Sequence, residues 1–292
     1  MYNVCMPYNY AHAIMAQKAR EKREKQVQTL LSEQAGYYLL GTMGPDPYFG
    51  DALPPPVGRT SQAALADKLH AVSLERLFAG LLPLAEGDDG LFCYTLGFLC
   101  HVLLDNHTHP YIEARFPGKG HTPAEIAMDP ILAKRSGDPR YWMPPKAFYG
   151  AEEDAIQAID QLHTKLMWKL FALRTPGAYR RSLKKWFRVC SLQFDPKGVK
   201  ARLFKLVPGA TDYLLTYDKA DDQDLLNERH APWGKQHRAE GETSPSFMDL
   251  FDQACQEAAQ CLELAVKLRG TGDYGPLLQR LTGRSADAAE SL

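Results

Sequence analysis

The sequence has no apolar run long enough to cross a bilayer, and its N-terminus lacks a basic start followed by an apolar stretch. We therefore expect no transmembrane segment, no secretory signal and a cytoplasmic location. The chain also has almost no net charge, −1 over 292 residues, which removes any overall electrostatic attraction to nucleic acid or to an anionic membrane. Nucleic acid is therefore disfavoured as a partner.

The six cysteines lack the close pairs that cysteine-rich zinc sites require. With 45% hydrophobic residues, a chain of this length can bury a core without disulfides. We therefore expect reduced cysteines in the core and, if a metal is bound, ligands of another type.

Apolar residues recur with helical spacing along most of the chain, which predicts an all-α fold: a compact bundle of many helices. The predicted helices lie near 8–35, 61–80, 89–106, 121–136, 150–172, 176–191 and 245–269. The loop between the first two contains five prolines and four glycines, so we expect no regular structure there. We expect a single domain over 1–270, an irregular excursion at 193–244 and a flexible tail at 271–292.

Two pairs of histidine and carboxylate have the spacing that places both side chains on one helical face. His101 and Asp105 are four residues apart in an apolar segment, where burial is costly unless the two are paired or bind a metal. His121 and Glu125 repeat the spacing. A hydrogen-bonded pair is the alternative for the first, and an acidic first turn of a helix, with Asp129, is the alternative for the second.

Other candidate ligands are weak when taken singly. His109 stands where Pro110 is expected to end a helix, and His107 precedes it, so either could turn toward a metal. The upstream candidates are His12, Asp46 and His70. Nitrogen and oxygen ligands without thiolates are typical of catalytic zinc, and neighbouring zinc ions are typical of hydrolysis at phosphorus.

Taken in order, the motifs resemble those of the zinc-dependent phospholipase C family, whose fold is shared with single-strand nucleases. The resemblance rests on GTMGPDPYFG, His70, YTLGFLCHVLLDNHTHPYI, HTPAEIAMDPIL, Pro232–Trp233 and SFMDLFDQA, and extends to about residue 270. It implies a compact all-α bundle with a site for several zinc ions. The implied ligands are His12, Asp46, His70, His101, Asp105, His109, His121 and Glu125.

The resemblance also implies how the ligands are shared. One zinc would be held by Asp46, His70, His101 and Asp105, and a second by His109, His121 and Glu125. Asp105 would bridge to a third zinc held by His12. In secreted relatives a processed N-terminus completes that third site, whereas here Met1 stands only 11 residues before His12. Two zinc ions are therefore expected, with the third weak or absent.

The resemblance implies a zinc-dependent phosphodiesterase that acts on a phospholipid-like substrate by a metal-activated water, with Asp46 as the catalytic acid or base. Tyr48, Phe49 and Tyr111 adjoin the ligands and are candidates for lining the substrate pocket, although packing is the alternative for each. The basic stretch 179–188 could contact phosphates or a membrane surface, or could be a solvated helix face. The alternative functions are a nuclease or nucleotide phosphodiesterase, and a non-catalytic metal-stabilised scaffold.

Overall fold

The computed structural model describes residues 9–52, 62–150, 152–207, 209–216, 224–234 and 243–285. The described residues form an all-α fold, as the sequence predicts, with two isolated β-bridges and no strand in those ranges. The α-helices are α1 (Asn9–Glu21), α2 (Lys25–Glu33), α3 (Ala35–Gly41), α4 (Ala63–Ala71), α5 (Leu74–Ala85), α6 (Asp89–Arg115), α7 (His121–Ser136), α8 (Pro145–Tyr149), α9 (Glu153–Phe171), α10 (Ala178–Gln193), α11 (Val199–Leu203), α12 (Phe247–Leu268) and α13 (Gly275–Leu281). The 3₁₀ helices are η1 (Asp46–Ala52), η2 (Gly118–Gly120), η3 (Pro139–Trp142) and η4 (Ala210–Tyr213).

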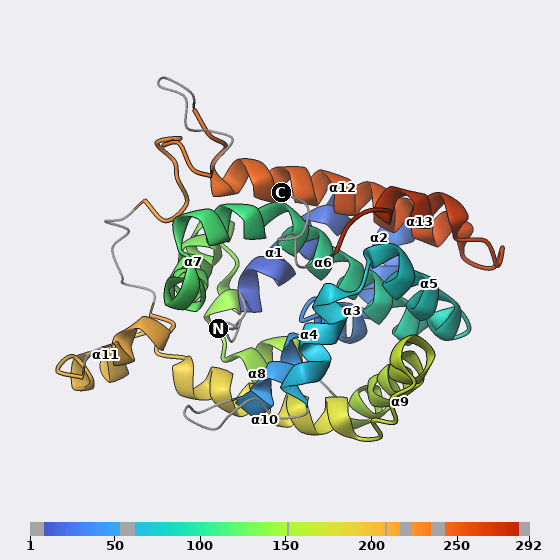
Figure 1. The fold of residues 1–292 in the computed structure, drawn as a ribbon, viewed down its shortest axis with the longest axis horizontal. Coiled ribbons are helices and arrows are strands. Elements are labelled where there is room, and N and C mark those ends of the chain that lie inside the picture. Colours follow the sequence, from blue (N-terminus) through green and yellow to red (C-terminus); the bar gives the residue numbers. More distant parts are fainter. Residues whose placement is uncertain are drawn as a thin grey trace.

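Helix α6 is the centre of the bundle (Figure 1). It packs against α1, α3, α5, α7, α9 and α12. The helix begins where the Asp88 carboxylate accepts a hydrogen bond from Leu91 N, at 2.8 Å. Its residues from Phe92 to Asp105 are all buried. Burial of His101 and Asp105 in this segment is costly unless each has a polar or charged partner.

Two glycines allow α3 and α6 to cross with their backbones in contact. A Cβ atom at Gly41 would lie 2.1 Å from the carbonyl oxygen of Tyr94, and one at Gly97 would lie 2.1 Å from that of Tyr38. No larger residue fits at either position without moving a helix. This close crossing places the residues that follow α3 directly beside His101.

The predicted helix positions are confirmed, but several boundaries differ. The region near 8–35 is divided into α1 and α2, and the region near 61–80 is divided where Val72 is extended and Ser73 caps α5. Pro110 was expected to end α6, yet the helix continues to Arg115. Proline removes only one backbone donor, and the buried surroundings of Tyr111 and Ile112 hold the next turn in place.

The proline-rich loop after α3 contains more regular structure than the sequence predicts, because η1 spans Asp46–Ala52. Residues 53–61 lie outside the described ranges. Gly50 brings η1 against α10: a Cβ atom there would lie 2.6 Å from Trp186 N and 2.7 Å from Ser182 O. The loop is therefore held on a helix that is far away in the sequence.

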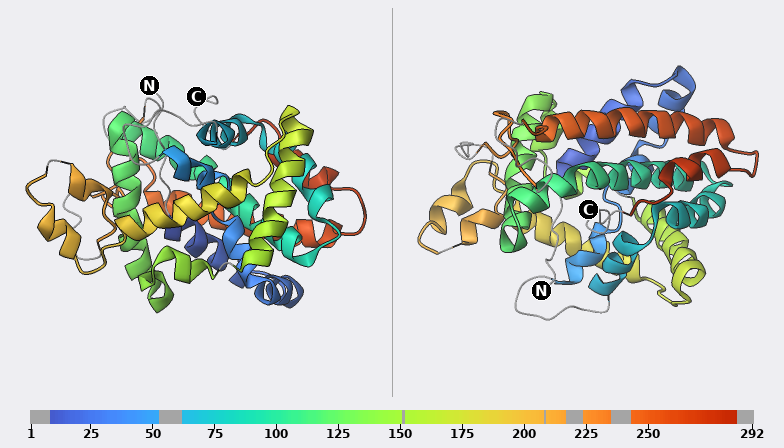
Figure 2. Two further views of the ribbon diagram at one scale, coloured as in Figure 1. Left: turned by 90° about the horizontal axis from the view of Figure 1, so that it is seen from below. Right: turned by 45° about the horizontal axis from the view of Figure 1, so that its top comes forward.

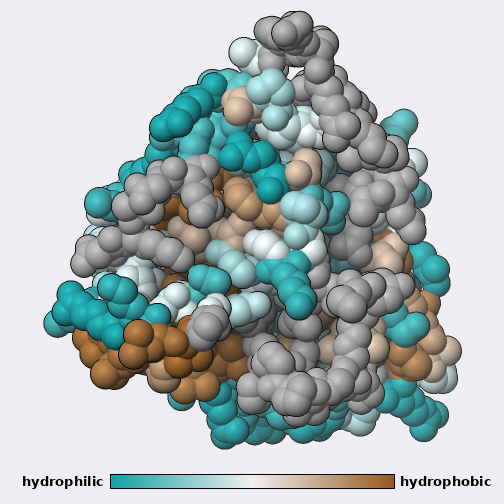
Figure 3. All heavy atoms as spheres, turned by 60° about the vertical axis from the view of Figure 1, so that its left-hand side comes forward, coloured by the Kyte–Doolittle hydropathy of each residue, from teal (hydrophilic) through white to brown (hydrophobic). Residues whose placement is uncertain are grey.

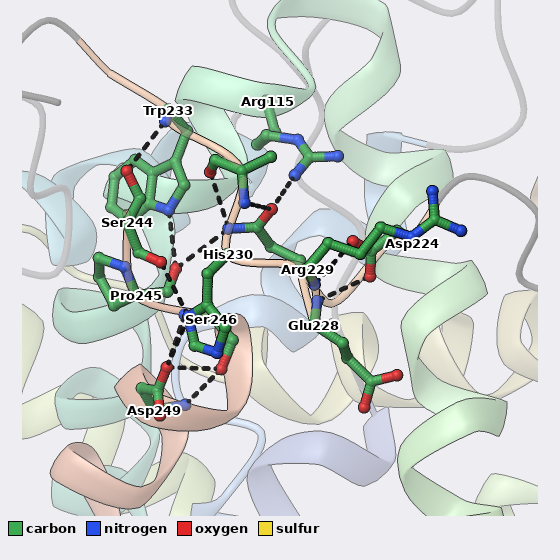
Figure 4. A network of polar contacts seen from close by, with 12 residues as sticks. Arg115, Asp224, Glu228, Arg229, His230, Trp233, Ser244, Pro245, Ser246 and Asp249 are labelled. Atoms are coloured by element: carbon green, nitrogen blue, oxygen red, sulfur yellow. Dashed lines mark hydrogen bonds and ion pairs between the residues drawn. The ribbon is translucent and has the colours of Figure 1, made fainter. Parts of the chain in front are cut away.

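A network of hydrogen bonds joins the described part of the excursion at 193–244 to the bundle (Figure 4). The buried side chain of Asn227 accepts a hydrogen bond from Arg115, at 2.7 Å, and donates to the carbonyl oxygens of Ala231 and Pro245. The indole nitrogen of Trp233 also donates to the carbonyl oxygen of Pro245, at 2.8 Å. This network joins the loop to both α6 and the start of α12.

The C-terminal region differs from the expected flexible tail. Residues 275–281 form α13, which packs against α5 and α12 with Leu277 and Leu281 fully buried. The two leucines, four residues apart, give this short segment an apolar face to bury. Residues 286–292 lie outside the described ranges.

No helix of the described residues combines the length and the apolar character needed to cross a membrane. The cysteines of these residues lie in the core, as expected, and they are Cys93, Cys100, Cys190, Cys255 and Cys261.

Candidate metal centre

All eight ligand candidates from the sequence are buried, and they come together in the middle of the bundle from four α-helices and the 3₁₀ helix η1. Their side chains form three groups in which the candidate ligand atoms lie within 4.8 Å of one another. The groups are Asp46, His70 and His101; His12, His101 and Asp105; and His109, His121 and Glu125. The first two groups share His101, and the third adjoins them because Nε2 of His109 lies 3.4 Å from Oδ1 of Asp105.

The first group joins η1, α4 and α6. Nε2 of His70 lies 3.3 Å from Oδ1 of Asp46, and Nε2 of His101 lies 3.7 Å from Oδ2 of the same carboxylate. Donor atoms around one tetrahedral zinc lie about 3.3 Å apart, given metal–ligand distances of about 2.0–2.1 Å. The spacing of these three side chains therefore suits a shared cation.

Asp105 stands at the centre of the whole cluster. Its Oδ1 lies 3.3 Å from Nε2 of His12 and 3.4 Å from Nε2 of His109, and its Oδ2 lies 3.0 Å from Nε2 of His101. The His12 and His101 rings are stacked, with centroids 4.1 Å apart. One carboxylate thus faces three imidazole rings, an arrangement that lets it bridge metals.

The third group lies where α6 meets α7. Nε2 of His121 is 2.9 Å from Oε1 of Glu125, and Nε2 of His109 is 3.8 Å from the same oxygen. The helix α7 spans 121–136, as predicted, so the spacing of four residues does place His121 and Glu125 on one face. Both are buried, which argues against the alternative of an exposed acidic first turn.

Backbone carbonyl groups orient two of the rings. Nδ1 of His101 lies 3.1 Å from the carbonyl oxygen of Thr42, and Nδ1 of His70 lies 2.9 Å from that of Ala66. A carbonyl oxygen only accepts, so each Nδ1 carries a proton and donates it. When the ring is neutral, Nε2 then carries a lone pair, and this lone pair faces a carboxylate.

A lone pair 3.0 Å from a carboxylate oxygen is repulsive unless a cation lies between them. Nε2 of His101 is such an atom: it is fully buried and makes no hydrogen bond of good geometry, although Asp105 and Asp46 both face it. A metal ion, or a proton, would relieve this repulsion. The donor set of imidazole and carboxylate matches the ligands of zinc in catalytic sites.

The carboxylates and the burial have opposite effects on the histidines. Burial and then the neighbouring His101 lower the pKa of His12 to about 3. Burial also opposes charge on His101, but Asp105 and Asp46 outweigh it and raise the pKa of that ring. Burial alone would raise the pKa of Asp105, yet His101, His109 and His12 hold it well below its usual range. Asp105 is therefore an anion at neutral pH.

Asp129 contributes to the site in a way that the sequence does not reveal. Its carboxylate accepts hydrogen bonds from the backbone nitrogens of Tyr10, at 3.0 Å, and Ala11, at 2.9 Å. From α7, it therefore caps the start of α1 at the two residues that directly precede His12. The sequence suggests only that Asp129 complements the start of its own helix, because nothing local shows that α1 begins against α7.

The other candidates lie apart from the cluster or pack beside it. His107 directs Nε2 to Glu257 Oε2, at 2.7 Å, and belongs to none of the three groups. The hydroxyl of Tyr48 lies 3.2 Å from Nδ1 of His163, and that of Tyr111 donates to the carbonyl oxygen of Leu225. Phe49 stacks against His70, with centroids 5.7 Å apart.

These contacts account for the aromatic residues as packing groups, and the substrate-lining role expected from the sequence stays a prediction. The ring of Tyr111 meets Trp233 edge to face, at 5.4 Å, so it anchors the excursion to α6. The expectation about the N-terminus and a third zinc falls on residues 1–8, which lie outside the described ranges.

Gly44 is required for His101 to occupy its place, and this can be tested. Its φ is +50°, and a Cβ atom there would lie 2.2 Å from the His101 ring. We expect Gly44→Ala to lower the free energy of unfolding by about 2–5 kcal/mol, the sum of left-handed strain and overpacking, and to reduce metal binding. Denaturant unfolding and elemental analysis of the purified variant measure the two effects.

The matched control is Gly137→Ala. Gly137 has φ +69° with no atom within 4 Å of the added Cβ, so this variant carries the strain without the clash. We expect it to cost about 1 kcal/mol and to keep its metal. Equal losses of stability in the two variants would show that Gly44 does not determine the position of His101.

The family model described as "Zinc dependent phospholipase C" matches residues 9–186, which is more than half of the chain and includes every residue of the cluster. The search of curated proteins found no match, and neither did the search of solved structures. The family's dependence on zinc agrees with the donor atoms and their spacing. The chain belongs to the zinc-dependent phospholipase C family.

Proposed function

We propose that the protein is a zinc-dependent phosphodiesterase that hydrolyses a phospholipid-like phosphodiester. One observation carries the proposal: eight buried histidines and carboxylates form adjoining groups around Asp105, inside the region that matches the family. A scaffold would need only one closed site, whereas adjoining sites that share a carboxylate suit displacement at phosphorus.

The proposed ligands are the same eight residues. Asp46, His70 and His101 would hold one zinc, His109, His121 and Glu125 a second, and Asp105 would lie between them. His12 would hold a third zinc together with Asp105. When bound, zinc supplies positive charge to a phosphoryl oxygen and lowers the pKa of water.

The residues of the chain have separate tasks in this proposal. The Asp46 carboxylate accepts a proton from the attacking water at Oδ2. This oxygen lies 3.7 Å from Nε2 of His101, whereas Oδ1 lies closer to its histidine neighbour, at 3.3 Å from Nε2 of His70. Thr42 and Ala66 fix the His101 and His70 rings through Nδ1. Burial of the cluster limits bulk water and strengthens these electrostatic interactions.

The test is turnover of a generic diester, bis-p-nitrophenyl phosphate, by the zinc-loaded full chain. We expect hydrolysis that 1,10-phenanthroline abolishes and added zinc restores, because the chemistry requires the metal. Elemental analysis of the same sample gives the zinc content. Bound zinc without turnover of this or any other diester would favour the non-catalytic scaffold and contradict the proposal.

A pair of substitutions of equal size tests the proposed ligand set. We expect His109→Gln to lose zinc and turnover, since Nε2 of His109 faces both Asp105 and Glu125. His107→Gln should keep both, because His107 binds Glu257 outside the cluster. Zinc content and diester turnover are measured on both variants. Equal loss of zinc in the two would show that the histidines are assigned in the wrong register.

A further inference from the structure

A surface of apolar and basic residues stands outside the region that matches the family. It is formed by residues 197–207, here called the α11 projection, which follows α10 and contains α11. In Figures 1 and 2, α11 stands out from the helical bundle. Its apolar side chains are among the most exposed of the described residues, with Leu206 exposed by 94% and Leu203 by 75%.

Apolar and cationic residues alternate on this surface. The exposed apolar residues are Val199, Leu203, Phe204, Leu206 and Val207. The cations of the segment are Lys197, Lys200, Arg202 and Lys205, and the segment has no carboxylate. Figure 3 brings this side of the molecule forward and shows a hydrophobic patch bordered by hydrophilic residues. A contiguous exposed patch of this kind marks an interaction site.

Hydrogen bonds hold the projection in place although its leucines face solvent. Asp195 is buried and accepts hydrogen bonds from Lys200 N, at 3.0 Å, and from Ala201 N, at 2.8 Å. The ammonium group of Lys200 donates to the carbonyl oxygens of Ser191, Leu192 and Phe194 at the end of α10. An isolated β-bridge between Phe194 and Leu215 pairs the backbone before the projection with the backbone after it. The apolar side chains are therefore presented on a fixed backbone.

The chemistry of this surface fits one partner. Apolar side chains flanked by cations insert at the boundary of headgroups and acyl chains, where the cations meet anionic phosphates. Lys200 is occupied by carbonyl groups, which leaves Lys197, Arg202 and Lys205 exposed for the headgroups. The 3₁₀ helix η4, which packs against α11, also packs against α7, the helix that carries His121 and Glu125.

We propose that the α11 projection docks the protein onto an anionic phospholipid surface. This inference rests on the proposed function in one respect only: it supplies the surface on which a phospholipid-like substrate would be met. Docking itself requires neither zinc nor turnover. It can therefore be measured separately from hydrolysis.

The experiment is sedimentation of the full chain with vesicles of phosphatidylcholine, with or without phosphatidylserine. We expect binding to the mixed vesicles to exceed binding to pure phosphatidylcholine by about tenfold or more, since each cation near an anionic surface contributes about fivefold. Leu203→Ser/Leu206→Ser should reduce binding to mixed vesicles by at least about tenfold. Arg202→Gln/Lys205→Gln should remove most of the preference for phosphatidylserine.

The control is Trp168→Ser, which removes a large exposed apolar side chain on α9, away from the projection. It should bind vesicles as the wild type does. Turnover of bis-p-nitrophenyl phosphate in the absence of vesicles should be the same in all variants, which also shows that they are folded. No turnover by the zinc-loaded wild type, together with binding to the mixed vesicles, would contradict the proposed function but support the docking surface.

Two outcomes would overturn the docking proposal. One is that the Leu203→Ser/Leu206→Ser variant sediments with the mixed vesicles as much as the wild type does. The other is that the wild type forms oligomers in solution that this variant dissociates, while neither sediments with vesicles. The projection would then be an interface between copies of this chain.

Discussion

Asp105→Asn is expected to remove at least one equivalent of zinc and to lower kcat/KM for bis-p-nitrophenyl phosphate by about a thousandfold or more. Asp105 faces His12, His101 and His109 at 3.0–3.4 Å, so its loss affects every zinc of the proposed site. Asparagine keeps the shape but replaces an anionic oxygen by an amide group, and removal of a shared ligand produces losses of this order. Elemental analysis and initial rates measure the two effects.

The matched control is Glu257→Gln, the same change from carboxylate to amide at a partly buried site outside the cluster. Glu257 binds His107 and Arg284, which hold its pKa near 2 against the effect of burial. This variant should lose some stability while keeping its zinc. If Asp105→Asn retained as much zinc as Glu257→Gln, Asp105 would not be the shared ligand.

Asp46→Asn is expected to lower kcat by about a hundredfold or more, the scale for losing a positioned acid or base. The carboxylate is preorganised: Asp46 N donates to the carbonyl oxygen of Met43, at 3.2 Å, and prolines flank the residue on both sides. Stopped assays over a range of diester concentrations separate kcat from KM.

Folding of Asp46→Asn must be checked by thermal unfolding, because Asp46 also contacts His70 and His101. Zinc content separates a loss of ligand from a loss of proton transfer. If Asp46→Asn kept wild-type turnover and full zinc content, Asp46 would be only a turn residue and would not be the proton acceptor.

The parts of the site that rest on helical spacing could be predicted from the sequence. His101 with Asp105, and His121 with Glu125, need only a regular helix to share a face, and both helices form. His12, Asp46 and His70 were weak candidates when taken singly and joined the ligand set only through the resemblance, because each comes from a different element. No local pattern shows that α1, η1 and α4 meet beside α6.

Other features depend on contacts between distant segments, which no sequence window contains. Asp129 caps α1 from α7, and Gly44 leaves room for a ring on α6. The continuation of α6 through Pro110 and the packing of α13 reflect burial that outweighs local preference. The position of buried His163 also depends on distant contacts, because its ring nitrogens lie within hydrogen-bond distance of the hydroxyls of Tyr48 and Tyr94, which come from separate elements.

The central claim is that the buried histidines and carboxylates bind zinc in adjoining sites around Asp105. Anomalous diffraction at the zinc absorption edge, from crystals of the zinc-loaded full chain, tests it most directly. We expect at least two peaks, one among Asp46, His70 and His101 and another among His109, His121 and Glu125. A cluster without an anomalous peak, or zinc bound only at other residues, would contradict it.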